Sequence, residues 1–286
     1  MPHSIANTRY RPVFFFSLSL LIPWALWFIA AQISHTSGQE NSPWLAALML
    51  AGLFAPVLLA LWLVWRNPVL RADTRPRVLR LSGFPKRYLL AALLLPPISL
   101  VVAQLVSLLF GHSADQFYIS GNPSFSSTVM SPWLILALAA VVEEWAWHSY
   151  GTDSLLSRFS LFAASLIFTV YWALWHLPLG FIKGYYHNEL MASGALYTAN
   201  FVVSMVVFVL LMNWVYMKSG RSIAVAALFH LSANLGNEIF ATHPDSKVIQ
   251  TGILLLISAM VLYREKELFF RRPQHHRSDT RIQQNG

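Results

Sequence analysis

Cysteine is absent from this chain of 286 residues. Its absence excludes a disulfide framework, thiolate metal ligands and the chemistry of cysteine proteases. Charged residues are also scarce, at 11% of the chain against 56% hydrophobic residues, and the mean hydropathy is +0.52. Soluble domains of this size carry about twice that share of charge. The composition therefore indicates a membrane protein.

The charges that remain are mostly positive, with a formal net charge of +8. A basic balance is also found in nucleic-acid-binding proteins. Here, however, the Lys and Arg residues lie in the loops between long apolar runs. We therefore expect contact with the lipid bilayer and exclude nucleic acid as a partner.

The apolar runs predict an all-α fold, a polytopic transmembrane bundle of about eight helices. A helix needs about 20 apolar residues to cross a bilayer core of about 30 Å. The segments that approach this length are 13–33, 44–65, 88–110, 131–150, 160–181, 195–217, 222–240 and 248–263.

The chain divides into three parts on this pattern. Residues 1–130 hold the first three helices and a basic cytoplasmic loop. Residues 131–263 hold the polar residues inside apolar segments, and residues 264–286 form a basic tail that we expect to be disordered in the cytoplasm.

Positive charge also sets the orientation. With the N-terminus in the cytoplasm, all but two of the 20 Lys and Arg residues fall on the cytoplasmic side, the exceptions being Lys183 and Lys247. Both termini are then cytoplasmic. Segment 13–33 is also compatible with a cleaved signal peptide, but its apolar stretch exceeds the usual ~7–15 residues, so we expect a retained helix. The lack of cysteine and the simple tail suit a bacterial inner membrane.

Two adjacent acids, Glu143 and Glu144, lie inside the fourth segment. At ~1.5 Å per residue, Glu143 is about 18 Å from the start of that helix, near the middle of the membrane. One charge there costs about 2.5–3.5 kcal/mol. The pair is therefore either functional or protonated and bonded to neighbouring helices.

Histidines accompany these acids. His148 lies four residues after Glu144, where it can hydrogen-bond the carboxylate or simply cap the helix end. His176 ends the fifth segment, and His230 and Asn234 share one face of the seventh. Each of these residues alone is compatible with polar contacts between helices.

Together, two glutamates, two histidines and an asparagine are the groups needed to activate water and stabilise an oxyanion. Nearby tryptophans are interpreted mainly as core or interface aromatics, namely Trp145, Trp147, Trp172 and Trp175.

These residues resemble the CAAX-protease and bacteriocin-processing (CPBP, or Abi) family of intramembrane proteases. That family carries EExxxR, FxxxH and HxxxN or HxxxD on successive helices, and segments 143–148, 172–176 and 230–234 match in order and placement. The resemblance covers about residues 131 to 240 and makes residues 131–263 the catalytic core. Two positions depart from the pattern: His148 replaces the arginine, which is always charged, and Trp172 replaces the phenylalanine in an exchange that we take as mild.

The resemblance implies that Glu143 activates a water with help from His176, while His230 and Asn234 hold the oxyanion. Glu144 would orient the site or pair with residue 148. A metal version instead makes Glu143, His176 and His230 ligands of Zn²⁺. The sequence has no HExxH helix to decide between the two, and we expect no tightly bound zinc to be required.

The sequence therefore predicts an intramembrane endopeptidase that cuts a membrane-associated protein or peptide near the cytoplasmic half of the bilayer. One alternative is a non-catalytic relative that binds a membrane partner or confers immunity, which the missing arginine makes credible. The other is a proton-coupled transporter, whose acids are expected at stepped depths on several helices. Among the acids inside the apolar segments, only Glu238 lies on a different helix from Glu143 and Glu144.

Overall fold

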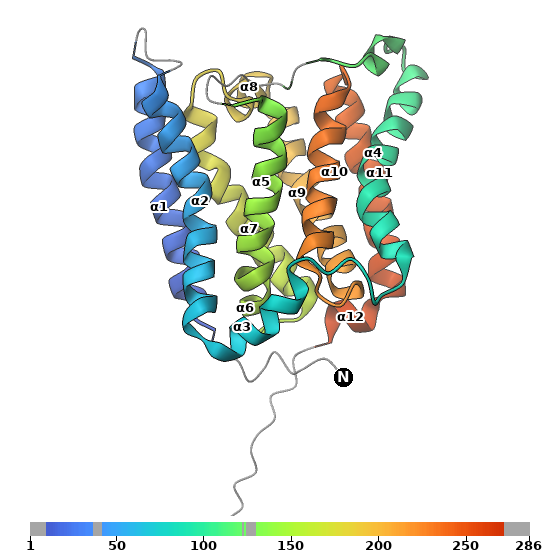
Figure 1. The fold of residues 1–286 in the computed structure, drawn as a ribbon. Coiled ribbons are helices and arrows are strands. Elements are labelled where there is room, and N and C mark those ends of the chain that lie inside the picture. The colour runs from blue at the N-terminus through green and yellow to red at the C-terminus, as the bar shows by residue number, and fades with distance from the viewer. Residues whose placement is uncertain (1–9, 37–41, 122, 124–129, 272–286) are drawn as a thin grey trace, which may run out of the picture.

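The computed structural model describes residues 10–36, 42–121, 123 and 130–271, which fold into a bundle of α-helices (Figure 1). Within these residues the structure has no strand, and Ile119 and Phe240 form a single isolated bridge. The all-α prediction is confirmed.

The helices match the predicted segments closely. They are α1 (Pro12–Ser34), α2 (Pro43–Arg66), α3 (Pro68–Thr74), α4 (Lys86–Leu108), α5 (Pro132–Ala146), α6 (Thr152–Leu156), α7 (Leu161–His176), α8 (Tyr186–Ala192), α9 (Ala195–Lys218), α10 (Ile223–Ile239), α11 (Pro244–Arg264) and α12 (Lys266–Phe270).

Six helices of the described part are long and apolar enough to cross a membrane: α1, α2, α4, α7 with the 3-10 turn that follows it, α9 and α11. The other two predicted segments correspond to α5 and α10, which are shorter, at 15 and 17 residues. A π-helical stretch, Trp147–Gly151, joins α5 to α6 without a break. The prediction of about eight helices therefore corresponds to eight helical segments, of which six meet a strict length requirement.

Helix starts follow from local sequence. Proline occupies the first turn of α1, α2, α5 and α11, where its missing N–H costs no hydrogen bond. Ser222 caps α10, with its side chain accepting from the Val225 N–H at 3.2 Å. These signals start both helices that carry the central polar residues of the predicted site.

Packing brings the polar segments together. Helix α10 packs against α4 and α5, and α7 packs against α9 (Figure 1). Helix α5 also packs against α2. The acids of α5 and the histidine of α10 therefore face one another across a helix interface.

The two ends of the bundle differ. One end, which we call the basic end because most of the described Lys and Arg residues lie there, carries α3, α6 and α12 (Figure 1). The other end, which we call the α8 end, carries α8 together with the starts of α5, α9 and α11 (Figure 1). The expectation that residues 264–286 are disordered is wrong for those that form helix. Arg264 completes α11, and Lys266–Phe270 form α12, in which the apolar Phe269 is fully buried against the bundle. Residues 272–286 lie outside the described part.

Candidate active site

Glu143 lies on α5, where it lines a cavity. Its Oε2 accepts the indole N–H of Trp172 at 3.0 Å, and the Nε1 of Trp147 lies 3.4 Å from the same oxygen. An indole nitrogen only donates, so this oxygen must accept. Trp147 and Trp172 belong to the buried core, as predicted, and their N–H groups also contact the Glu143 carboxyl group.

Glu144 is fully buried behind the cavity wall. Its Oε2 lies 2.5 Å from His148 Nδ1, and its Oε1 lies 2.7 Å from His230 Nδ1. The i,i+4 pairing with His148 is thus the alternative that the structure adopts, and the helix-end cap is not. Glu144 links two histidines and has no direct place in the cavity lining.

His148 has acceptors at both ring nitrogens. Its Nε2 lies 3.0 Å from the Asn213 Oδ1, and the Asn213 side-chain amide donates to Ser165 Oγ at 2.9 Å, which fixes the orientation of the amide. Because Glu144 and Asn213 both present oxygen acceptors, the ring satisfies both only with an N–H at each nitrogen. His148 therefore bonds Glu144 from the position that arginine has in the family pattern.

His176 ends α7, one turn beyond Trp172. Its Nδ1 donates to the Trp172 carbonyl oxygen at 2.7 Å, because a carbonyl only accepts. Nε2 then carries a lone pair, suited to accept a proton. The ring stacks on His187 of α8 at 5.0 Å between centroids.

His230 lies on α10, with Nδ1 directed at Glu144 and Nε2 left for the cavity. Its ring centroid lies 5.5 Å from the Trp172 ring, and that of His176 lies 5.1 Å from the same ring. Trp172 also bonds Glu143. These contacts bring three helices to one point, as the sequence predicted.

A cavity of about 530 Å³ contains this point. Glu143, His176, His230 and Asn234 all line it, and Glu238 lines it one turn beyond Asn234. Many of the remaining lining side chains are apolar, among them Leu53, Phe201, Phe208, Leu211 and Phe229. The geometry suits an extended peptide or a hydrocarbon chain bound beside the polar groups.

The proposed zinc ligands do not fit a metal well. Among the described residues, the group whose ligand atoms all lie within 4.8 Å of one another consists of His112, His243 and Asp245. Glu143, His176 and His230 form no such group, although zinc requires ligands about 2.0–2.2 Å from one ion.

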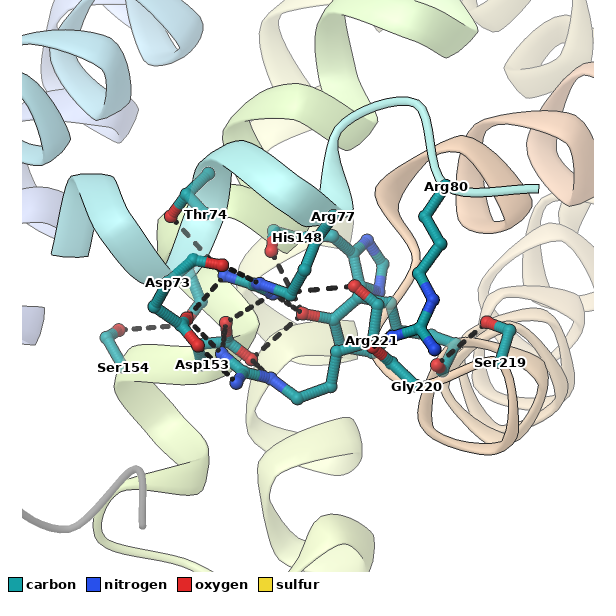
Figure 2. Close-up of polar contacts among 12 residues, drawn as sticks. Asp73, Thr74, Arg77, Arg80, His148, Asp153, Ser154, Ser219, Gly220 and Arg221 are labelled. Atoms are coloured by element: carbon teal, nitrogen blue, oxygen red, sulfur yellow. Dashed lines mark hydrogen bonds and ion pairs between the residues drawn. The ribbon is translucent and has the colours of Figure 1, made fainter. Parts of the chain in front are cut away.

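An ion-pair cluster at the basic end was not predicted (Figure 2). Arg77 Nη1 lies 3.0 Å from Asp153 Oδ2, Arg221 Nη2 lies 2.8 Å from Asp73 Oδ2, and Arg221 also pairs with Asp153. Burial alone would raise the pKa of Asp153, but the guanidinium groups of Arg221 and Arg77 outweigh it and hold this pKa below its usual value. Asp73 and Arg77 also pair and are four residues apart, but the other partners are far apart in sequence, so no spacing signal reveals them.

This cluster reaches the site through Tyr216. The Tyr216 hydroxyl lies 3.0 Å from Asp153 Oδ1 and 3.1 Å from the His148 carbonyl oxygen. The rings of Tyr216 and His148 are also in contact, with centroids 4.4 Å apart. The ion pairs therefore hold the π-helical stretch on which His148 lies.

Comparison with known proteins supports the resemblance. A family model described as type II CAAX prenyl endopeptidase Rce1-like matches residues 125–236. A protein of Methanococcus maripaludis named CAAX prenyl protease 2 is 34% identical over 268 residues, which are 93% of this chain and 98% of that protein. The matched model region contains all the predicted catalytic residues.

Proposed function

Because the chain belongs to the Rce1-like family of type II CAAX prenyl endopeptidases, we propose that this intramembrane endopeptidase hydrolyses its substrate with a water activated by Glu143. One observation carries the proposal: Glu143, His176, His230 and Asn234 line a single cavity inside the helical bundle. A membrane-associated protein or peptide that enters this cavity is the proposed substrate.

Glu143 is the proposed general base. The indoles of Trp172 and Trp147 hold its Oε2, so Oε1 is the oxygen that takes a proton from water. His176 has its Nδ1 proton committed to a backbone carbonyl, so its Nε2 accepts a second hydrogen bond from the same water. The two groups orient and deprotonate the nucleophile.

His230 and Asn234 are the proposed oxyanion donors. With Nδ1 bonded to Glu144, an imidazolium at His230 presents its Nε2 proton to the cavity. An imidazolium at His230 also balances the charge of Glu144, which offsets part of the cost of a charge in an apolar interior.

The alternative of a non-catalytic relative rested on the missing family arginine. His148 bonds Glu144 from that position, and the relative that is 34% identical is named as a protease, so we favour the enzyme.

Variants of the base and the donor test the proposal. Glu143→Gln is expected to lower kcat by about 10²–10⁴-fold, the range for loss of a general base. His230→Ala is expected to lower it by about 10²–10³-fold through loss of an oxyanion donor. Both variants are expected to insert and accumulate as the wild type does. The control is Glu267→Gln, which changes an exposed acid of α12 outside the cavity lining. Wild-type cleavage by both site variants would refute the roles of these residues.

A further inference from the structure

Three side chains that can bind a metal lie together at the α8 end of the bundle. His112 follows α4, and His243 and Asp245 lie at the start of α11. Each offers one ligand atom, and these atoms all lie within 4.8 Å of one another. None of the three residues lines the cavity that contains Glu143. The group is therefore separate from the proposed catalytic residues.

The distances within the group fit one small ion. His112 Nε2 lies 3.3 Å from Asp245 Oδ2, and His243 Nδ1 lies 3.7 Å from the same oxygen. Two ligand atoms bound to one tetrahedral zinc ion are roughly 3.3–3.6 Å apart. His243 Nδ1 also accepts the backbone N–H of Asp245 at 3.2 Å, so this nitrogen carries no proton, as a metal ligand requires. The group is therefore spaced for an ion between its members.

The Asp245 carboxylate is oriented by another helix. The Tyr197 hydroxyl, near the start of α9, donates to Asp245 Oδ1 at 2.9 Å, which leaves Oδ2 directed at the histidines. Carboxylates that bind metals are commonly fixed by an outer hydrogen bond of this kind. An acid in the first turn of α11 would by itself be explained by the helix dipole. The dipole does not explain two histidines beside the acid, one of them from another segment.

Local structure fixes the position of His112. Gly111 ends α4 at φ +87°, and the His112 N–H donates back to the Ser107 carbonyl oxygen at 3.3 Å, which is the closing bond of a Schellman turn. The Gln116 side chain donates to Ser107 Oγ at 2.8 Å and accepts from Ser246 Oγ at 2.6 Å. These buried bonds hold the end of α4 against the start of α11. The ligands on the two segments are therefore preorganised.

We propose that His112, His243 and Asp245 bind Zn²⁺, with water completing the coordination, and that the ion fastens one part of the cavity rim. Imidazole nitrogen suits Zn²⁺, whereas Ca²⁺ and Mg²⁺ prefer oxygen ligands. Thr242 and Pro244, which flank His243, both line the cavity. An ion that joins α4 to α11 therefore fixes the rim segment between α10 and α11. The proposal does not depend on the catalytic mechanism.

Zinc binding to purified, untagged protein in detergent tests the proposal. The protein is stripped with a chelator, and zinc affinity is then measured by competition with a chromogenic chelator. We expect the wild type to bind one equivalent. Tyr197→Phe removes the outer hydrogen bond and is expected to weaken binding by about 10–100-fold. His112→Ala and Asp245→Asn, which each remove a ligand, are expected to weaken binding at least as much.

Two control variants separate this site from other zinc ligands. His35→Ala changes an exposed histidine after α1, and Glu143→Gln changes the candidate active site. Both are expected to bind zinc as the wild type does. Zinc binding that survives in His112→Ala and Asp245→Asn, or that is lost in Glu143→Gln, overturns the proposal.

Thermal unfolding provides a second readout. Added zinc is expected to raise the unfolding midpoint of the wild type and to leave that of His112→Ala unchanged, because an ion that binds the folded state stabilises it. The midpoint of His112→Ala without zinc shows whether the variant folds. An equal rise in both proteins overturns the proposal. Cleavage is not measured, so failure of the proposed catalytic roles leaves this result intact.

Discussion

The indole of Trp172 donates to Glu143, and its ring contacts the rings of both His176 and His230. The family pattern has phenylalanine at this position, and from sequence the exchange looked mild because both residues are aromatic. Tryptophan differs from phenylalanine in having an N–H donor. The importance of this donor depends on an acceptor on the neighbouring helix, which sequence spacing does not reveal. The structure thus gives Trp172 a positioning role that a phenylalanine lacks.

Trp172→Phe removes this donor while it keeps most of the ring. A hydrogen bond to a charged group contributes about 1.5–3 kcal/mol to stability, so we expect a lower thermal unfolding midpoint. We also expect kcat to fall, because the Glu143 carboxyl group loses the donor that holds it. Trp175→Phe is the matched control, because the buried Trp175 N–H has no hydrogen-bond partner among the described residues. Equal activity of the two variants would show that Trp172 acts only by packing.

His148 illustrates what the sequence left open. From sequence, His148 could either bond the Glu144 carboxylate or cap the helix end. Its residue type and its spacing from Glu144 are compatible with both alternatives. The position of Asn213, on α9, decides between them. That contact joins residues 65 apart, so it could not be predicted from local pattern.

Variants of His148 test its role. His148→Arg keeps a donor beside Glu144 and is expected to remain active. His148→Ala leaves the buried oxygens of Glu144 and Asn213 without this partner and is expected to be weak. Equal activity of these variants and of the control His35→Ala would make His148 a bystander.

Zinc dependence is a separate prediction. We expect purified protein to keep its activity after a chelator is added, because the ligand atoms of Glu143, His176 and His230 do not all lie within 4.8 Å of one another. Zinc that copurifies is expected to be lost in His243→Ala, which breaks the group at the α8 end. One equivalent of zinc retained in that variant, with activity lost to the chelator and restored by zinc, contradicts the prediction.

Among the helical elements, the π-helical stretch between α5 and α6 turns the chain from the acids toward the ion-pair cluster. Such stretches occur often at functional sites. The sequence predicted the helix well, from its apolar run and its first-turn proline, but neither the π-helical turn nor the burial of Asp153. Both depend on partners contributed by segments distant in the chain.

Asp153→Asn tests this cluster. The change leaves the guanidinium groups of Arg77 and Arg221 without a buried carboxylate, which costs about 3–5 kcal/mol in comparable pairs. We expect a large fall in the thermal unfolding midpoint in detergent. Asp73→Asn, at a site that is 28% exposed, is expected to cost less. An unchanged midpoint for Asp153→Asn would show that the cluster adds no stability.

Acid is expected to weaken the contribution of Asp153 to the stability of the folded protein. The pKa of Asp153 is lower in the folded state, so its contribution is fully present above the unfolded-state pKa of ~3.9. It is lost as pH falls through the lower folded-state value. Wild type and Asp153→Asn should therefore converge in stability only in strong acid.

For the whole molecule, composition and charge predicted most of the architecture. Apolar runs located the helices to within a few residues, because the bilayer fixes both their length and their character. The three motif segments met at one cavity as expected. The contacts that hold each side chain there were not predicted, because they join residues on different helices.

Reporter fusions test the orientation. A reporter fused after Arg77 is expected to be cytoplasmic and one fused after Ser120 is expected to be on the opposite side, because Lys and Arg accumulate in cytoplasmic loops. These positions flank α4, at the basic end and the α8 end respectively. The reverse assignment would reject the charge argument.

Mass spectrometry of peptide cleavage in H₂¹⁸O tests the central claim most directly. Purified wild-type protein is incubated with a library of membrane-tethered peptides, alongside Glu143→Gln. The account predicts products whose new carboxyl terminus carries ¹⁸O from solvent, formed by the wild type and nearly absent with the variant. Cleavage at the same rate by Glu143→Gln, or no cleavage by either protein, would contradict it.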